Sequence, residues 1–213
     1  MELYLIRHGQ SASNANPANK SFEPPLTELG ERQARRAGSE LADRGIVRLY
    51  CSPMLRALQT ARIIAEPLGL VPHVFVGLHE WYSQRDYHGL TRQQMIDVCP
   101  DVVLPEDVTD GGWYYYPWVD IPTMLVQIGE NTRRFLAHLE RHHPEHDERV
   151  AAVSHGGFLS TLIGTFYGLE PDDDPDRFAH RNVTISKIRR IDGRTQLRYM
   201  SCLSHLDDDM VTW

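Results

Sequence analysis

The stretch that decides the fold is Leu5-Ile6-Arg7-His8-Gly9-Gln10-Ser11, close to the N-terminus of the chain. It continues a short apolar run over residues 2–6, which has the pattern of a buried strand. In open α/β sheets, ligands bind in the crevice at the carboxyl ends of the strands. A strand that ends in Arg7, His8 and Gly9 would supply a guanidinium group for an anion, a potential nucleophile and a backbone able to bend around a ligand. The tripeptide alone would also fit a strand that merely ends in polar residues, so the rest of the sequence has to decide.

Length and composition are those of an ordinary globular chain. Its 213 residues suffice for one α/β domain with a well-buried core, with or without an insertion. The net charge of −7 offers no basic surface to nucleic acid or anionic lipid. No apolar run approaches a membrane span, and the N-terminus lacks the layout of a signal peptide. Cys51, Cys99 and Cys202 are odd in number and widely spaced, which favours neither a zinc site nor a disulfide framework. We therefore expect a cytoplasmic protein with no nucleic-acid or membrane partner.

Alternating strands and helices follow the first stretch. Thr27 has the features of an N-cap, and Gly45 closes the helix that begins there. After a strand at 47–51, Ser52 and Pro53 have the features of an N-cap and first residue of a helix that runs to about residue 66. The remaining predicted elements are strands at 73–76 and 150–153, helices at 123–142 and from 158 onward, and a closing hairpin of 184–191 and 196–200. This order predicts one α/β domain over residues 1–213.

The alternation lapses over residues 77–122, which we interpret as a cap or lid insertion above the strand ends. Thr91 begins a sequence with capping-box spacing and predicts a short helix there. The aromatic cluster from Trp113 to Trp118 has two interpretations. It lines a pocket for a leaving group, or it packs the lid onto the body of the domain.

Three predicted strands end in polar motifs that share one possible chemistry: Arg7-His8-Gly9, Ser52-Pro53 followed by Arg56, and Ser154-His155-Gly156-Gly157. A phosphomonoester dianion needs several fixed positive donors. Arg7 and Arg56 can each contact two oxygens, and His155 can donate a further contact. The amide of Gly156 opens a helix, which is itself a favourable end for an anion. His8 can then attack phosphorus as a neutral imidazole, if a nearby carbonyl holds its other ring nitrogen.

Glu80 is the candidate for the general acid that the departure of an alkoxide requires. It lies just after the third predicted strand, in Gly77-Leu78-His79-Glu80-Trp81, and therefore near the same edge of the sheet. A solvated surface carboxylate is the alternative that spacing alone favours.

The ordered set of motifs resembles the signature of the histidine phosphatase superfamily, the phosphoglycerate-mutase-like proteins. The similarity begins at 5–11 and continues through Leu26-Thr-Glu-Leu-Gly30, Ser52-Pro-Met-Leu-Arg56-Ala-Leu-Gln59-Thr60-Ala61, Glu80 and 154–157, so it covers nearly the whole chain. The resemblance implies a three-layer α/β/α sandwich around a mostly parallel sheet, with a partly helical cap. It implies no metal and no organic cofactor.

The resemblance also implies a role for each matched residue. His8 would be the phosphorylated nucleophile and Glu80 the proton donor. The phosphate pocket would consist of Arg7, Arg56 and His155. By the same resemblance, Gln10 and Asn14 would lie at the edge of this pocket.

The sequence departs from the pattern of the mutases at two places, and these departures favour the phosphatase branch of the superfamily. Mutases of this superfamily usually carry a Trp-x-Asp element before the Leu-Thr-x-x-Gly segment, where this chain reads Lys20-Ser-Phe-Glu-Pro-Pro25. The run after Glu80 ends in Gly89-Leu-Thr91, which is closer to the phosphatase branch. We therefore expect a metal-independent phosphomonoesterase of the histidine acid phosphatase type, acting on a small-molecule phosphomonoester. The alternatives are a cofactor-dependent phosphoglycerate mutase and a catalytically silent relative that binds phosphate or acts as a scaffold.

A histidine cluster near residues 138–146 suggests a metal site at first sight. His138 and His142 have the i, i+4 spacing of a metal-binding pair, and His143 and His146 follow. These residues lie among Glu and Arg side chains at a predicted helix end, without the carboxylate-bearing pocket of a metal centre. We expect no functional metal here.

Overall fold

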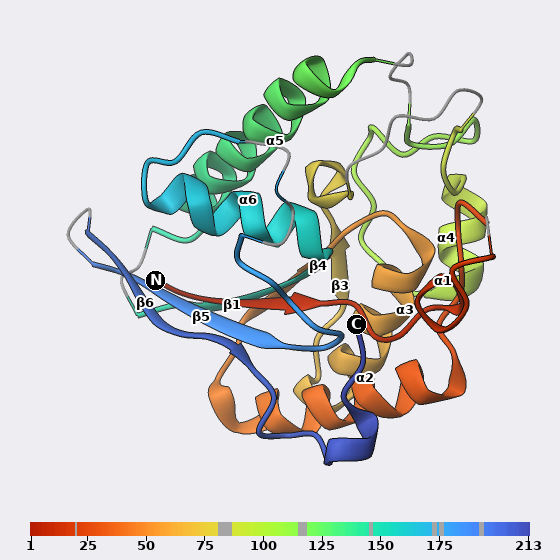
Figure 1. Ribbon diagram of the computed structural model, residues 1–213, viewed down its shortest axis with the longest axis horizontal. Coiled ribbons are helices and arrows are strands. Elements are labelled where there is room, and N and C mark those ends of the chain that lie inside the picture. Colours follow the sequence, from red (N-terminus) through yellow and green to blue (C-terminus); the bar gives the residue numbers. More distant parts are fainter. Residues whose placement is uncertain are drawn as a thin grey trace.

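A mixed sheet forms the centre of the molecule (Figure 1). The computed structural model describes residues 1–19, 21–80, 87–114, 119–144, 147–171, 174, 177–191 and 194–213. In this part of the chain the sheet has six strands in the order β3-β2-β4-β1-β5-β6. Their bounds are β1 Glu2–Arg7, β2 Arg48–Cys51, β3 Pro72–Val74, β4 Arg149–Ser154, β5 Ile185–Ile191 and β6 Arg194–Cys202. The first four strands in the spatial order are parallel. Strand β5 is antiparallel to β1, and β6 is antiparallel to β5, so β5 is the one reversed strand among the described six.

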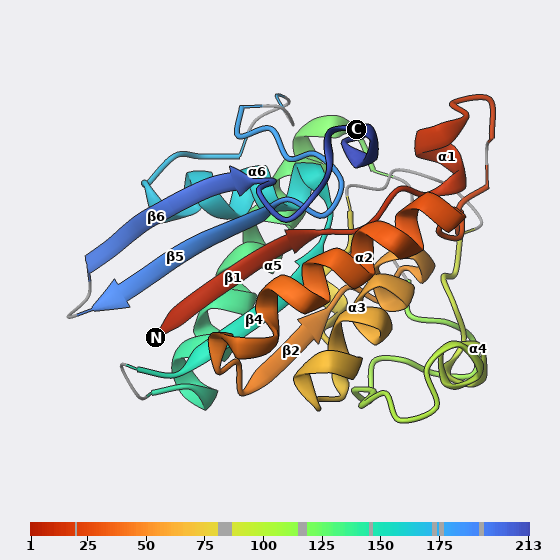
Figure 2. The same cartoon turned by 90° about the horizontal axis from the view of Figure 1, so that it is seen from below.

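Helices cover both faces of this sheet. The α-helices are α1 Ala12–Ala15, α2 Glu28–Leu41, α3 Leu55–Leu68, α4 Arg92–Val98, α5 Ile121–His142 and α6 Gly156–Phe166. The 3₁₀ turns are η1 Ala42–Arg44, η2 Val76–Leu78 and η3 Asp208–Met210. Helices α2 and α3 lie on one face, and α5 and α6 lie on the other (Figures 1 and 2). The three-layer α/β/α sandwich predicted from the sequence is therefore confirmed.

The central strand β1 shows why the sequence folds this way. Successive side chains of a strand point to opposite faces. Tyr4 and Ile6 accordingly pack with α2 and α3, whereas Leu3 and Leu5 pack with α5 and α6. All four are buried, so β1 reads as a continuous apolar run, as expected for a parallel strand covered on both sides.

Local signals placed several elements correctly. The Thr27 hydroxyl accepts a hydrogen bond from the Gly30 N–H at the start of α2, and Gly45 is left-handed with φ 65° just after η1. Thr91 forms the predicted capping box at the start of α4. Helix α5 begins two residues before the predicted start because Asp120 caps it through the Thr123 N–H.

Several predicted boundaries differ by one to three residues from the observed ones, and for two of them the structure shows the cause. Helix α3 begins at Leu55, not at Pro53, because a carboxylate from another loop binds its first N–H: Glu23 Oε2 accepts from Leu55 N at 2.7 Å. Strand β3 ends at Val74, not at residue 76, because the chain turns into η2.

The interpretation of residues 77–122 as a lid stays a prediction, since 81–86 and 115–118 lie outside the described residues. Within the described part, Trp113 and Tyr114 are buried in the core cluster that also contains residues of α2 and α3. Gly89 makes room for Trp113: a Cβ at Gly89 would lie 2.1 Å from the indole Nε1, and the Gly89 φ is +71°. For residues 113 and 114, packing is the interpretation that holds.

The remaining strands form the hairpin expected at the end of the sheet, with β5 and β6 antiparallel. The predicted turn at 192–193 lies outside the described residues. No helix in the described ranges is long and apolar enough to cross a membrane.

Candidate active site

The carboxyl ends of three parallel strands bring the predicted site residues together. Arg7 of β1 pairs with Ser154 of β4, and Cys51 of β2 pairs with Val153. This register places the residues that follow the three strands side by side. The His8 N–H donates to the Ser154 carbonyl at 2.9 Å, which ties the end of β1 to the end of β4.

His8 has the tautomer that a nucleophile needs. Its Nδ1 donates to the carbonyl of Gly9 at 2.7 Å, so the proton of a neutral ring is on Nδ1. Nε2 is then unprotonated and accepts a hydrogen bond from Arg56 Nε at 3.1 Å. Burial first, and then the charges of Arg56 and Arg7, hold the pKa of His8 well below its usual value. The carbonyl partner expected from the sequence is present.

His155 lies beside His8 with its ring fully buried. The two ring centroids are 5.1 Å apart, and His155 Nε2 lies 2.7 Å from the Ser52 hydroxyl. Within the described chain, its Nδ1 is a buried atom with no hydrogen-bond partner. Burial, followed by the charge of Arg56, lowers the pKa of His155 well below its usual value. Ser52 therefore orients this imidazole and does not cap α3.

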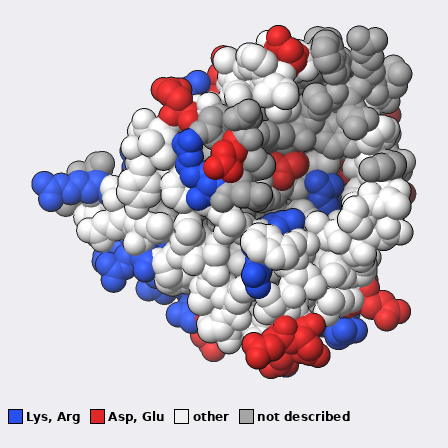
Figure 3. All heavy atoms as spheres, viewed as in Figure 1, with Lys and Arg blue, Asp and Glu red and all other residues white. Residues whose placement is uncertain are grey.

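The two arginines reach the same place from different elements. Arg7 ends β1, and its Nη1 donates to the carbonyl of His180 at 2.5 Å. The side chain of Arg7 also passes next to Gly156, where an added Cβ would lie 3.7 Å from Arg7 Nε. Arg56 is in the first turn of α3 and contacts His8 directly. Positively and negatively charged side chains meet in a hollow on this face of the molecule (Figure 3).

Glu80 lies at the N-terminus of α6, not on an open surface. Its Oε2 accepts from the Gly157 N–H at 3.2 Å, and its Oε1 accepts from the Phe158 N–H at 3.1 Å. These two amides belong to the second and third residues after His155. The turn before Glu80 is fixed by the Ser154 hydroxyl, which donates to the carbonyl of Leu78 at 2.7 Å. The structure thus brings Glu80 to the same cluster as His155.

Gln10 and Asn14 lie next to the His8 loop. Gln10 Oε1 accepts from the Thr27 hydroxyl at 2.7 Å. Asn14 Oδ1 accepts from the N–H and the hydroxyl of Ser11 at 3.1 and 3.0 Å and from Asn182 Nδ2 at 3.3 Å. Asn14 Nδ2 makes no hydrogen bond with the described residues, so this end of the amide can donate to a ligand.

The His8 loop is held by several supporting residues. The sequence motifs had not assigned them to the site. Asn182 Nδ2 donates to the carbonyl of His8 at 3.1 Å. Val183, which follows Asn182, has φ 50°, an uncommon conformation for a β-branched residue. The Thr60 hydroxyl accepts from the Gly9 N–H at 3.0 Å and donates to the Arg56 carbonyl at 2.7 Å. Of these contacts, only the alignment of Thr60 with Arg56 on one helix face could be read from sequence spacing.

Glu23 is a further residue that the sequence did not indicate. One carboxylate oxygen accepts from Leu55 N, and the other accepts from the Tyr87 hydroxyl at 2.5 Å. Burial raises the pKa of Glu23, while Tyr87, Leu55 and the charge of Arg56 act in the opposite direction. Glu23 therefore joins two distant loops to the helix that carries Arg56.

The histidine cluster near residue 138 is separate from this site. His138 and His142 are stacked with ring centroids 4.1 Å apart, and His138 Nε2 lies 3.0 Å from the Tyr50 hydroxyl. Within the described ranges, no three His, Cys, Asp or Glu side chains are arranged to hold a metal ion. His146 lies outside the described residues.

The buried neutral histidines predict a loss of stability in acid. Burial lowers the pKa of His79 and of His180 to about 4, whereas an exposed histidine titrates near 6.5. Their stabilising contribution is complete above pH of about 6.5 and is lost as the pH falls towards 4. We expect the free energy of unfolding to drop by roughly 2–3 kcal/mol for each such residue between pH 7.5 and 4.5.

Denaturant titration at a series of pH values measures this loss. His79→Gln should flatten the pH dependence, whereas His88→Gln, which changes an exposed histidine, should leave it unchanged. An unaltered slope in His79→Gln would contradict the assignment.

Comparison with known proteins identifies the family. The sequence model of the histidine phosphatase superfamily (branch 1) matches residues 3–202. A Yersinia enterocolitica protein named "Probable phosphoglycerate mutase GpmB" is 28% identical over 200 residues, which is 88% of this chain and 84% of that protein.

Solved structures share the fold. The mycobacterial glucosyl-3-phosphoglycerate phosphatase, in complex with VO3, has a TM-score of 0.69 and 24% identity, covering 95% of this chain and 99% of that chain. A phosphoserine phosphatase mutant from Entamoeba histolytica, in complex with phosphoserine, has a TM-score of 0.69 and 22% identity, covering 96% and 98%. With a family match that spans almost the entire sequence, this chain belongs to the histidine phosphatase superfamily, branch 1.

Proposed function

We propose that the protein is a phosphomonoesterase that works through a phosphohistidine intermediate on His8. The observation that carries the proposal is the state of the His8 ring, with Nδ1 held by the Gly9 carbonyl and Nε2 unprotonated beside Arg56. A low pKa keeps this imidazole neutral at physiological pH, so it is ready to attack phosphorus.

Arg7, Arg56 and His155 bind the phosphate in this proposal. Guanidinium groups suit phosphate because each can donate two parallel hydrogen bonds. His155 Nδ1, buried without a partner among the described residues, is available to a phosphate oxygen. Asn14 Nδ2, Gln10 and the Gly156 amide complete the pocket. Two fixed guanidinium charges take the place that Mg²⁺ has in other phosphoryl-transfer enzymes, so the reaction needs no metal.

The reaction proceeds in two in-line steps. In the first, the bond from phosphorus to His8 Nε2 forms as the bond to the leaving oxygen breaks, and Glu80 protonates the departing alkoxide. In the second, water attacks phosphorus, Glu80 accepts its proton, and the bond to His8 breaks. The products are an alcohol and inorganic phosphate. The Glu80 carboxylate binds the N–H groups of Gly157 and Phe158, the two residues that follow His155 and Gly156. This position supports its role in both steps.

A phosphoglycerate mutase is the second candidate, because the Yersinia relative carries that name. A mutase uses the same phosphohistidine but returns the phosphoryl group to a bound phosphoglycerate. The segment 21–25 favours the phosphatase: its one acidic residue, Glu23, is engaged with Leu55 and Tyr87.

A substrate panel in metal-free buffer with a chelator distinguishes the candidates. We expect release of inorganic phosphate from p-nitrophenyl phosphate and from a subset of alkyl phosphates, with inhibition by vanadate. Interconversion of 2- and 3-phosphoglycerate that depends on 2,3-bisphosphoglycerate would identify a mutase instead. Activity that disappears with the chelator and returns with Mg²⁺ or Zn²⁺ would contradict the metal-independent pocket.

A further inference from the structure

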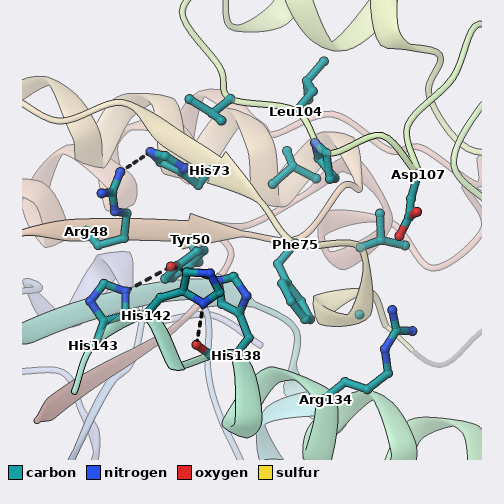
Figure 4. A pocket seen from close by; sticks show the side chains of 15 residues that line it. Arg48, Tyr50, His73, Phe75, Leu104, Asp107, Arg134, His138, His142 and His143 are labelled. Carbon is teal, nitrogen blue, oxygen red and sulfur yellow. Dashed lines mark hydrogen bonds between the residues drawn. The ribbon is translucent and has the colours of Figure 1, made fainter. Parts of the chain in front are cut away.

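A second pocket lies apart from the His8 site, against the edge strand β3 (Figure 4). It has a volume of about 460 Å³ and lies between β3, the loop 103–107 and the C-terminal half of α5. None of the residues proposed for catalysis and phosphate binding lines it. The proposed reaction therefore leaves this cavity without a role.

One part of the pocket wall is polar and held in place by hydrogen bonds. Tyr50 lies between two imidazoles, with its hydroxyl 3.0 Å from His143 Nε2 and 3.0 Å from His138 Nε2. His143 Nδ1 donates to Glu148 at 2.8 Å, and His142 Nδ1 donates to the His138 carbonyl at 2.9 Å. Figure 4 shows Tyr50 and the three imidazoles grouped along one side of the cavity. The wall is thus a preformed surface of hydrogen-bonding groups.

The permanent charges of the pocket are mainly positive, although the chain as a whole has a net charge of −7. Arg48 and Arg134 line it, against one carboxylate, Asp107. Arg48 is engaged with His73, whereas Arg134 is exposed and makes no hydrogen bond or ion pair with the described residues. Burial, then the neighbouring histidines, lower the pKa of His138 to about 4, so this ring is neutral at physiological pH. The guanidinium of Arg134 is therefore the positive group that can pair with an anionic ligand.

The opposite part of the lining is apolar. It consists of Val74, Phe75, Val76 and Leu104, and the Phe75 ring contacts the ring of His138 at a centroid distance of 5.1 Å. A cavity that combines an apolar, partly aromatic wall with a few placed polar groups is typical of small-molecule sites. The mainly positive charge favours an anion, and the apolar wall favours an apolar body on that anion.

The pocket is connected to Glu80 through a short and well-packed path. The turn η2 starts in the pocket wall at Val76 and ends two residues before Glu80. His79 donates from Nδ1 to the Glu80 carbonyl at 2.7 Å, and its Nε2 lies 3.2 Å from Asn131 Nδ2 of α5. The turn is closely packed at Gly77, where an added Cβ would lie 2.9 Å from Phe75 Cε1.

We propose that this pocket binds a small organic anion with an apolar body, a carboxylate, sulfonate or phosphate, and that its occupancy changes turnover at His8 by shifting the η2–Glu80 turn. Arg134 pairs with the anionic group, and Phe75 and Leu104 contact the apolar body. The binding part is independent of the proposed function, whereas the effect on turnover rests on it.

Binding is tested with 2-naphthoate and naphthalene-2-sulfonate, which carry no transferable phosphoryl group. Calorimetry with vanadate present, to occupy the His8 site, should give a Kd on the order of 1 mM or tighter for ligands of this size. Arg134→Ala should weaken binding about tenfold, the usual effect of losing a hydrogen bond to a charged group. Arg133→Ala is the matched control, because Arg133 is the adjacent exposed residue of α5 and does not line the pocket.

The outcomes separate the two parts of the proposal. Absence of binding, equal binding to Arg134→Ala and Arg133→Ala, or displacement of the probes by vanadate would overturn the site. Binding that depends on Arg134 establishes it, even if the protein hydrolyses no phosphomonoester. A probe that changes turnover of p-nitrophenyl phosphate in the wild type but not in Arg134→Ala supports the coupling. Arg134-dependent binding with unchanged turnover in an active enzyme would overturn the coupling alone.

Discussion

Replacing His8 by alanine is expected to abolish turnover of every phosphomonoester substrate, with a loss on the order of 10⁴–10⁶-fold in kcat, as for other enzymes that lose their nucleophile. His8 supplies the atom that becomes bonded to phosphorus. Among the described residues, no other imidazole accepts a hydrogen bond from Arg56 on an unprotonated Nε2. Steady-state assays with an aryl and an alkyl phosphate measure the loss.

The matched control for this change is His88→Ala, which removes an exposed imidazole and should retain full activity. Vanadate titration of both variants checks that the phosphate pocket stays intact. Substantial activity in a folded His8→Ala protein would show that phosphoryl transfer does not pass through this residue.

Glu80→Gln is expected to lower kcat for an alkyl phosphate on the order of 10²–10⁴-fold, the usual contribution of general acid catalysis. The substitution keeps the shape of the side chain but removes the proton that an alkoxide needs. An aryl phosphate such as p-nitrophenyl phosphate leaves as a stabilised phenolate, so its loss should be distinctly smaller. Glu66→Gln, at an exposed position of α3, is the control and should change neither rate.

The two losses must be compared in the phosphorylation step itself, by single-turnover kinetics. In steady state, Glu80 also orients water for breakdown of the phosphohistidine, and this would make the aryl substrate sensitive as well. Equal losses in the phosphorylation step for the two leaving groups would show that Glu80 acts only by capping α6 through Gly157 and Phe158.

The fold could be predicted from the sequence wherever the signal is local. The apolar run of β1, the Thr27 cap and the Thr91 capping box each depend on residues a few positions apart, and each was confirmed. The start of α3 could not be predicted in the same way. Its first N–H is bound by Glu23, more than 30 residues earlier, so the Ser52-Pro53 signal was misleading.

The candidate site was predictable to a similar extent. Motifs at the ends of parallel strands indicated that Arg7, His8 and His155 would meet, because the carboxyl ends of such strands share one edge of the sheet. The supporting residues had no such signal. Asn182 holds the His8 carbonyl from 174 positions away, and the left-handed conformation of Val183 belongs to a residue type that disfavours it.

The central claim is that phosphate passes through a covalent bond to His8, and rapid-quench trapping of the phosphoenzyme tests it most directly. Enzyme mixed with a radiolabelled phosphomonoester should be quenched in base, since phosphohistidine is acid-labile, and the label located by peptide mapping. The account predicts label on the peptide that contains His8, formed before phosphate is released and decaying at the rate of turnover. Turnover without label on that peptide, or label on another residue, would contradict it.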